Sequence, residues 1–143
     1  MSQITFTFGE TLMSQFNRDS FEASIIGDVI VVTFLDKKIY EDQQIERIKA
    51  KLHLLADAGA KKILMDFIGV EYVNEWYGML VAFHKKMFIN GGKLVMCHMD
   101  EEVFERFQWL KLDKLFVIVP NQQAALLYMA QDEADQPIFI QAT

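Results

Sequence analysis

One cysteine and three histidines are the side chains in this chain with the greatest capacity for nucleophilic or metal chemistry. Cys97 and His98 are neighbours in an apolar run typical of a strand, and adjacent strand residues point to opposite faces. They are therefore not expected to act as a nucleophile and its base, and Cys97 is assigned to the core. His53, His84 and His98 show no zinc-ligand spacing such as H-E-x-x-H, so we expect no metal site.

Three carboxylates, Asp66, Glu71 and Glu75, follow closely at the end of a predicted strand. The carboxyl ends of strands in open α/β sheets are common ligand sites, so a binding role for this trio has to be considered. Acidic side chains are mostly exposed, and a group of them is more often a solvated rim. We therefore interpret the trio as a solvated rim of the sheet.

Hydroxyl side chains are unevenly distributed. Residues 34–142 contain no serine or threonine, whereas the first 33 residues contain eight and Thr143 is the ninth. At average composition, a stretch of that length would carry roughly a dozen. The chain also lacks the G-x-x-x-x-G-K-[ST] and G-x-G-x-x-G patterns of nucleotide-binding loops. These absences argue against a hydroxyl nucleophile and a bound nucleotide, so we expect neither enzyme activity nor a cofactor.

The composition is that of one globular domain. The 143 residues are 52% hydrophobic, with two prolines and seven glycines. No apolar run reaches the roughly 20 residues of a membrane span, and the N-terminus does not have the pattern of a signal peptide. The net charge of −6, without a clustered basic face, argues against nucleic-acid binding. Together with the single cysteine, these features predict a cytoplasmic protein without membrane insertion.

Strand and helix patterns alternate along the chain. Residues 21–26 and 29–35, separated by Gly27-Asp28, have the pattern of a β-hairpin. The elements expected after it are a helix capped by Asp42 and stopped at Gly59, a strand over 62–67, a helix over 75–90, a strand over 93–99, a helix capped by Asp100, a strand over 115–119 and a helix over 121–131. This order predicts an α/β domain with a mostly parallel central sheet of about four to six strands and about four helices.

Two segments lie outside this alternation. Residues 1–20 are interpreted as an N-terminal extension that could add an edge strand over 4–8, and residues 132–143 as a C-terminal tail with a short strand over 137–141. The domain itself is predicted to span residues 21–131.

The helix over 75–90 carries two apolar lines. The first is expected to pack on the sheet and comprises Trp76, Met79, Leu80, Phe83 and Met87. Trp76 is therefore predicted to lie in the core. Tyr77 starts the second line, which continues through Val81, His84 and Phe88. The sequence leaves two interpretations of Tyr77 open, an exposed interface anchor or a packing residue.

Four segments carry a resemblance to a known family. They read K-K-I-L-M-D-F-I-G-V-E-Y over 61–72, G-G-K-L-V-M-C over 91–97, L-D-K-L-F over 112–116 and Q-A-A-L over 123–126. In composition and spacing they resemble the STAS domain family, which is named for sulphate transporters and anti-sigma factor antagonists. The resemblance implies one α/β domain that docks to protein partners, typically as a bacterial anti-sigma factor antagonist in a partner-switching circuit of transcription regulation.

The resemblance also implies a regulatory serine that this chain lacks. In the family, a kinase-type anti-sigma factor phosphorylates a serine at the start of the helix after the D-x-x-G-V strand end, and the phosphate breaks the complex. Counted forwards from Asp66, which is the register we prefer, this serine corresponds to Glu75. Counted backwards from Gly91-Gly92, it corresponds to Asn74. Neither side chain accepts phosphate, so we expect a domain without phosphoserine switching.

The residues at this predicted helix start have specific expected roles. Asn74 is expected to be the N-cap. Glu75 is either an ordinary first-turn glutamate or a permanent, partial mimic of phosphoserine. The surface expected to bind a partner consists of Gly69, Val70, Glu71, Asn74, Glu75 and Tyr77.

Two functions are consistent with these observations. The first is a non-enzymatic STAS regulator that binds an anti-sigma factor or a related kinase-type regulatory protein. The second is a ligand-binding or transporter-accessory module, because STAS domains also occur beside transporters. The first is preferred, because the chain shows neither a membrane span nor a phosphate-binding loop. Whether the protein also forms a homo-oligomer is left open.

Overall fold

A computed structural model of the chain describes residues 20–131, and these begin with the expected hairpin. Strands β1 (Phe21–Ile26) and β2 (Val29–Phe34) pair antiparallel, with Ile26 opposite Val29. Gly27 lies in the two-residue turn at a φ of +63°, a left-handed conformation that glycine adopts without steric penalty. The predicted hairpin is confirmed.

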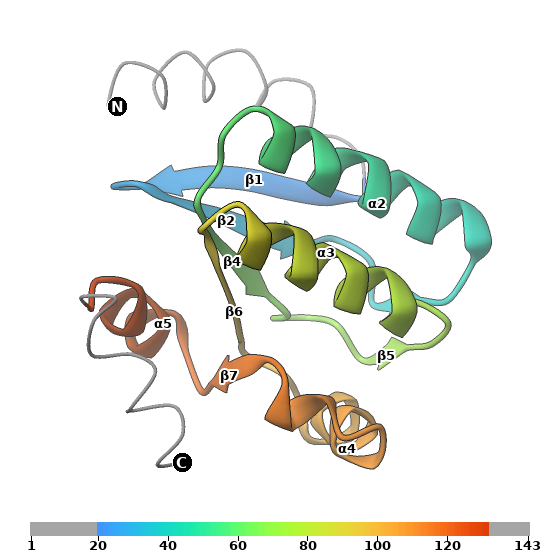
Figure 1. Ribbon diagram of the computed structural model, residues 1–143. Helices are drawn as coiled ribbons and strands as arrows, with labels where there is room; N and C mark the ends of the chain where they lie inside the picture. The colour runs from blue at the N-terminus through green and yellow to red at the C-terminus, as the bar shows by residue number, and fades with distance from the viewer. Residues whose placement is uncertain (1–19, 132–143) are drawn as a thin grey trace.

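The other strands of the main sheet run parallel to β2. β2 pairs with β4 (Lys62–Asp66), β4 with β6 (Lys93–Cys97), and β6 with β7 (Val117–Val119). The resulting order, β1-β2-β4-β6-β7, confirms the mostly parallel α/β sheet (Figure 1). Each of the three predicted strands is shorter than expected at one end, because the chain turns after Asp66 and Cys97 and before Val117.

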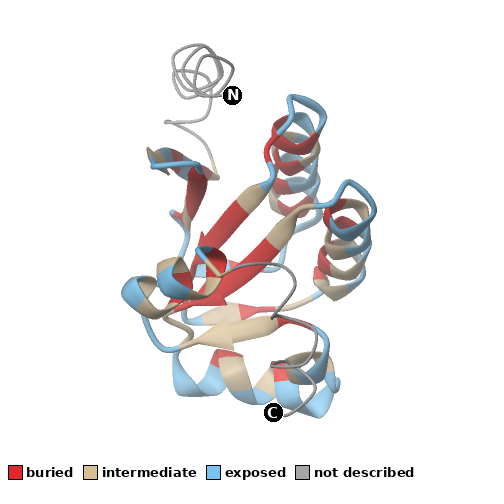
Figure 2. Cartoon of the chain, turned by 60° about the vertical axis from the view of Figure 1, so that its left-hand side comes forward, coloured by how far each residue is buried: buried red, intermediate tan, exposed pale blue. Residues whose placement is uncertain are grey.

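Helices cover both faces of this sheet. α2 (Asp42–Asp57) and α3 (Tyr77–Ile89) pack on one face, and α5 (Gln122–Met129) packs on the other (Figures 1 and 2). Strand residues alternate between the two sides, so that Met65 joins the core under α2 and α3 whereas Leu64 joins the core under α5. α4 (Glu101–Trp109) and the 3-10 turn η1 (Leu112–Lys114) lie between β6 and β7 in sequence.

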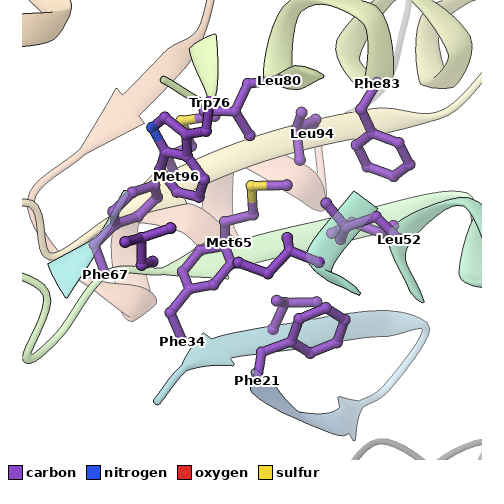
Figure 3. Packing of buried hydrophobic residues seen from close by; sticks show 14 of the residues in the cluster. Phe21, Phe34, Leu52, Met65, Phe67, Trp76, Leu80, Phe83, Leu94 and Met96 are labelled. Carbon is purple, nitrogen blue, oxygen red and sulfur yellow. The ribbon is translucent and has the colours of Figure 1, made fainter. Parts of the chain in front are cut away.

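Aromatic side chains form the centre of the larger core. Phe34, Phe67 and Trp76 are at most 3% exposed and meet edge to face, with ring centroids 5.2 Å apart for Phe34 and Phe67 and 5.3 Å apart for Phe34 and Trp76 (Figure 3). Such pairs contribute about 0.5–1.5 kcal/mol each beyond the area they bury. Trp76 therefore lies in the core, as predicted.

The predicted N-cap of α2 is wrong by one residue. Glu41 has an extended backbone and is the N-cap, and its N–H donates to the side-chain Oε1 of Gln44 at 2.9 Å. Asp42 is instead the first helical residue, where its carboxylate faces the positive end of the helix dipole. At the other end, Gly59 follows the C-cap with a φ of +105°, in agreement with the predicted stop.

The predicted starts of α4 and α5 are confirmed. Asp100 Oδ1 accepts a hydrogen bond from the backbone N–H of Val103 at 2.9 Å, and Asn121 Oδ1 accepts one from the N–H of Ala124 at 2.8 Å. Each cap satisfies a backbone donor that has no partner within the helix.

A second, smaller sheet was not predicted. β3 (Lys38–Ile39) pairs in parallel with β5 (Tyr72–Val73), beyond the carboxyl end of β4. The expected extension over 1–20, apart from Ser20, and the expected tail over 132–143 lie outside the described residues. Within 20–131, no helix combines the length and the apolar character needed to cross a bilayer.

Candidate functional site

The segment that joins β4 to α3, residues 67–76, contains most of the residues expected to bind a partner, and we call it the β4–α3 loop. Three of its backbone N–H groups donate to backbone carbonyls in the segment around β3. Glu71 and Tyr72 donate to the carbonyl of Lys37 at 2.7 and 3.1 Å, and Asn74 donates to the carbonyl of Ile39 at 2.9 Å. Strand-like backbone pairing therefore holds this part of the loop in place.

Side chains of the β4–α3 loop divide between core and solvent. Val70 is 1% exposed and Val73 is fully buried. Gly69, Glu71 and Glu75 are exposed. Val70 was expected to contribute to partner binding, but its burial means that its side chain is not available to a partner.

The start of α3 differs from the prediction at two residues. The N-cap is Trp76, without a side-chain cap, and the helix begins at Tyr77. Asn74 is therefore not the N-cap, and its Oδ1 accepts from the N–H of Glu75 at 3.0 Å. Glu75 is not in the first turn either, because it precedes the cap. Its φ of +68° places it in the left-handed region, which is unfavourable for most non-glycine residues.

Tyr77 packs against α4. Its ring centroid lies 5.5 Å from that of Phe107, and its hydroxyl donates to the carbonyl of Val73 at 3.3 Å. Burial raises the pKa of the Tyr77 phenol above its ordinary value. Tyr77 is therefore a partly buried packing residue. Its contacts do not test whether it also contacts a partner.

Tyr40, which is exposed, and Tyr72, a partly buried residue of the β4–α3 loop, form an aromatic stack. The rings of Tyr40 and Tyr72 meet edge to face with centroids 6.2 Å apart, and the guanidinium of Arg106 lies 4.9 Å from the Tyr72 ring centroid. Sequence reasoning missed this stack, because its members come from three separate elements and show no common spacing. It adds aromatic and cationic groups to the surface beside Glu71.

Asp66 is the centre of a second group of polar residues, at the carboxyl ends of β4 and β6. Its Oδ1 accepts from the backbone N–H of Ile68 at 3.0 Å and lies 2.9 Å from His98 Nδ1, and its Oδ2 lies 3.4 Å from Gln122 Nε2. Asp66 is only 5% exposed. The interpretation of the acidic trio as a solvated rim is therefore wrong for Asp66, although it describes the exposed Glu71 and Glu75.

Cys97 and His98 lie close together, and the expectation that they point to opposite faces is wrong. β6 ends at Cys97, and His98 turns back in the left-handed region at a φ of +59°, so its Nδ1 lies 3.8 Å from Cys97 Sγ. We call Asp66, Cys97, His98 and Gln122 the Asp66 cluster. Sequence reasoning missed the cluster because the alternation of side chains applies only within the strand.

The Asp66 cluster does not have the geometry of a cysteine nucleophile and its base. Asp66 and Cys97 both approach the same nitrogen of His98, whereas a catalytic triad uses the two ring nitrogens separately. Burial, followed by the charge and hydrogen bonding of Asp66, raises the pKa of the Cys97 thiol to about 12. Cys97 is fully buried, as predicted, and its thiol stays protonated at neutral pH.

Comparison with known proteins identifies the fold. No family model matches the chain. No curated protein matches it. Among solved structures, an anti-sigma-factor antagonist (STAS) domain protein from Planctomyces limnophilus is 23% identical, with a TM-score of 0.70 over 78% of this chain and 98% of that one. A candidate anti-sigma factor antagonist from Thermotoga maritima is 19% identical, with a TM-score of 0.70 over 78% and 95% of the two chains.

A third similar structure is much longer than this chain. The murine Solute Carrier 26 family member A9 anion transporter is 17% identical, with a TM-score of 0.59, and the match covers 85% of this chain and 19% of the transporter. At these levels of identity the matches show the fold, and the chain has the STAS fold that its sequence resembles.

Proposed function

We propose that this protein is a non-enzymatic regulator that binds an anti-sigma factor or a related kinase-type regulatory protein in the cytoplasm, and that it does so without a phosphoserine switch. The observation that carries the proposal is the helix start of α3. There the exposed Glu75 lies directly before the N-cap, and residues 34–142 contain no serine or threonine. The STAS fold, found also in proteins described as anti-sigma factor antagonists, supports a docking role.

The β4–α3 loop has the properties of a docking surface. Gly69, Glu71 and Glu75 are exposed, and Ile68 is 56% exposed. The backbone pairs with the segment around β3, which limits the ordering that binding would require. This pairing supports docking with little rearrangement of the loop.

Charge reversal in the loop tests where the partner docks. The partner is first identified by mass spectrometry of a native pull-down, in which a kinase-type regulatory protein supports the proposal. Glu71→Arg is then expected to weaken the complex at least tenfold in a titration, because it reverses the charge on the docking surface. Glu46→Arg, on the exposed side of α2, is the matched control and should leave the affinity unchanged. Equal effects of the two substitutions would place the docking surface elsewhere.

The lack of a phosphoacceptor has a separate test. Adding magnesium and ATP to the purified complex should leave its dissociation rate unchanged, because no hydroxyl at the start of α3 can receive phosphate. Release of the partner on adding ATP, together with phosphate on Ser20, Ser24 or Thr33, would replace this part of the proposal with an N-terminal switch.

A second function is favoured by one observation. The likeness to the murine anion transporter covers 85% of this chain, so the fold also occurs as a part of a transport protein. A transporter subunit as the principal protein in the same pull-down would favour a transporter-accessory role over the regulator.

A further inference from the structure

We propose that Asp66, Cys97 and His98 form a binding site for one divalent transition-metal ion of the zinc class. Each residue offers one ligand atom, and the carboxylate oxygen, the sulfur and the ring nitrogen all lie within 4.8 Å of one another. This is the one such group among residues 20–131. The proposal goes beyond the docking function and does not depend on it.

The ligand set fits zinc or cobalt better than calcium or magnesium. Thiolate and imidazole are the preferred ligands of borderline and soft metals, whereas calcium and magnesium prefer oxygen alone. The expectation of no metal site was based on histidine spacing along the chain. Here the ligands come from two strand ends that are neighbours in the sheet rather than in the sequence.

Two of the three distances between the ligand atoms are close to those around zinc. With tetrahedral geometry and standard bond lengths, zinc separates a nitrogen and an oxygen ligand by about 3.3 Å and a nitrogen and a sulfur ligand by about 3.6 Å. In this protein, His98 Nδ1 lies 2.9 Å from Asp66 Oδ1 and 3.8 Å from Cys97 Sγ. A bound ion would replace the contact between Oδ1 and Nδ1 and displace the Cys97 thiol proton to solvent, so that the sulfur binds as thiolate. These two distances would need to change only by a few tenths of an ångström.

The sheet fixes two of the three ligands. Asp66 and Cys97 are paired residues at the ends of β4 and β6, and they are 5% and 0% exposed. The third ligand comes from the left-handed backbone of His98, which brings the ring back towards the other two. Ligands carried by rigid strands hold a metal geometry more accurately than ligands on loops.

One side of the site is open. The His98 side chain is 31% exposed, so an ion can approach from solvent past its ring. Gln122, at the start of α5, borders the site with its amide 3.4 Å from Asp66 Oδ2. Three protein ligands and one open position are typical of zinc sites that exchange a water or another ligand, whereas purely structural zinc sites have four protein ligands.

Cobalt is the probe for the test, because a thiolate ligand gives Co²⁺ a charge-transfer absorption in the near ultraviolet. Titration of the full chain with Co²⁺ should give this absorption, saturate at one ion per chain and be reversed by Zn²⁺. Cys97→Ala should abolish the absorption. His98→Asn should weaken binding at least tenfold, and asparagine is chosen because it tolerates the left-handed backbone. His84→Asn is the control and should bind as the wild type does.

Thermal unfolding gives a second measurement that does not rely on the cysteine variant being stable. Zn²⁺ in excess should raise the Tm of the wild type, because a ligand that binds only the folded state stabilises it. The rise should be smaller in His98→Asn and unchanged in His84→Asn. Absence of both the cobalt absorption and the Tm rise in folded wild-type protein would overturn the proposal. So would a cobalt absorption that persists in Cys97→Ala.

Discussion

Glu75 and His98 show how single residues shape both candidate sites. Both have left-handed backbones, at φ values of +68° and +59°, although neither is glycine. Such a conformation costs about 1–2 kcal/mol for most residues. In each case the chain turns there, directly before the N-cap of α3 or directly after β6. The unfavourable backbone conformation of Glu75 and His98 therefore occurs at the two positions where the chain changes direction beside a candidate site.

Replacement of Glu75 by glycine should relieve this cost. Glu75→Gly is expected to raise the free energy of unfolding by about 0.5 kcal/mol, because the steric gain exceeds the added entropy of the unfolded chain. Glu71→Gly is the control and should lower it by about 0.5–1 kcal/mol, since Glu71 is not among the residues with positive φ. Urea denaturation of the two variants measures both changes. A loss of stability in Glu75→Gly would mean that its side chain makes a stabilising contact.

The pKa of Cys97 predicts a loss of stability at high pH. Burial, with the charge and hydrogen bonding of Asp66, raises this pKa from 9.0 to about 12. Above about pH 9 the unfolded chain can lose the thiol proton whereas the folded protein retains it, so stability falls by up to about 1.4 kcal/mol per pH unit until pH 12. Below pH 9 the thiol is neutral in both states and contributes no pH dependence.

Comparison with Cys97→Ala isolates this contribution. The wild type should lose stability between pH 9 and 10.5 more steeply than the variant in urea denaturation, with a chelator present so that metal binding does not contribute. The raised pKa values of Tyr77 and Tyr128 affect both proteins alike and cancel in the comparison. If the stability of the two proteins changes in parallel with pH, the Cys97 thiol ionises as easily in the folded state as in the unfolded state.

At the scale of elements, α3 connects the core to the proposed docking surface. Its N-cap Trp76 is buried against Phe34 and Phe67, and the following Tyr77 packs on Phe107 of α4. The position of the β4–α3 loop therefore depends on two adjacent aromatic residues with different neighbours.

Truncation of these aromatic residues should affect stability by different amounts. Trp76→Ala should lower the free energy of unfolding by about 3–5 kcal/mol, as the loss of a large buried aromatic does. Tyr77→Ala should lower it by about 1–3 kcal/mol, because the ring is only partly buried. Tyr77→Phe keeps the ring and should cost at most about 1 kcal/mol for the lost hydrogen bond. Thermal denaturation of the three variants measures these changes, and a Tyr77→Ala variant as stable as the wild type would show that the ring does not support the fold.

Two glycines, one in the first turn of α3 and one after its end, should respond in opposite ways to replacement by alanine. Gly78 is the second residue of the helix, and an added Cβ would meet no atom within 4 Å, so Gly78→Ala should stabilise the protein by about 0.5–1 kcal/mol. At Gly92, an added Cβ would lie 2.7 Å from the carbonyl oxygen of Lys61, so Gly92→Ala should destabilise by about 1–3 kcal/mol. Denaturation curves give the free energy of unfolding of both variants. A Gly92→Ala variant that is more stable than the wild type would show that the β4 and β6 backbones can move apart without cost.

At the scale of the whole molecule, the order of the large elements could be predicted from the sequence. The hairpin has two strand-like segments around a Gly-Asp turn, the parallel strands are short continuous apolar runs, and the helices have helical spacing or a cap that marks their start. β3 and β5 could not be predicted, because two residues are too few to show a period. The Asp66 cluster was also beyond prediction, because His98 and Gln122 are 32 and 56 residues from Asp66 along the chain.

The pairing of β3 with β5 also has a kinetic consequence. Association is slow when a loop must first rearrange, whereas docking of two preformed surfaces proceeds at about 10⁵–10⁷ M⁻¹s⁻¹, faster still with complementary charge. The segment around β3 holds the backbone of residues 71–74 in place. Under the proposed docking mode, a partner would therefore need only to collide in the right orientation. Changes to uncharged residues of this loop would then act mainly on the lifetime of the complex, whereas the charge reversal Glu71→Arg would also slow its formation.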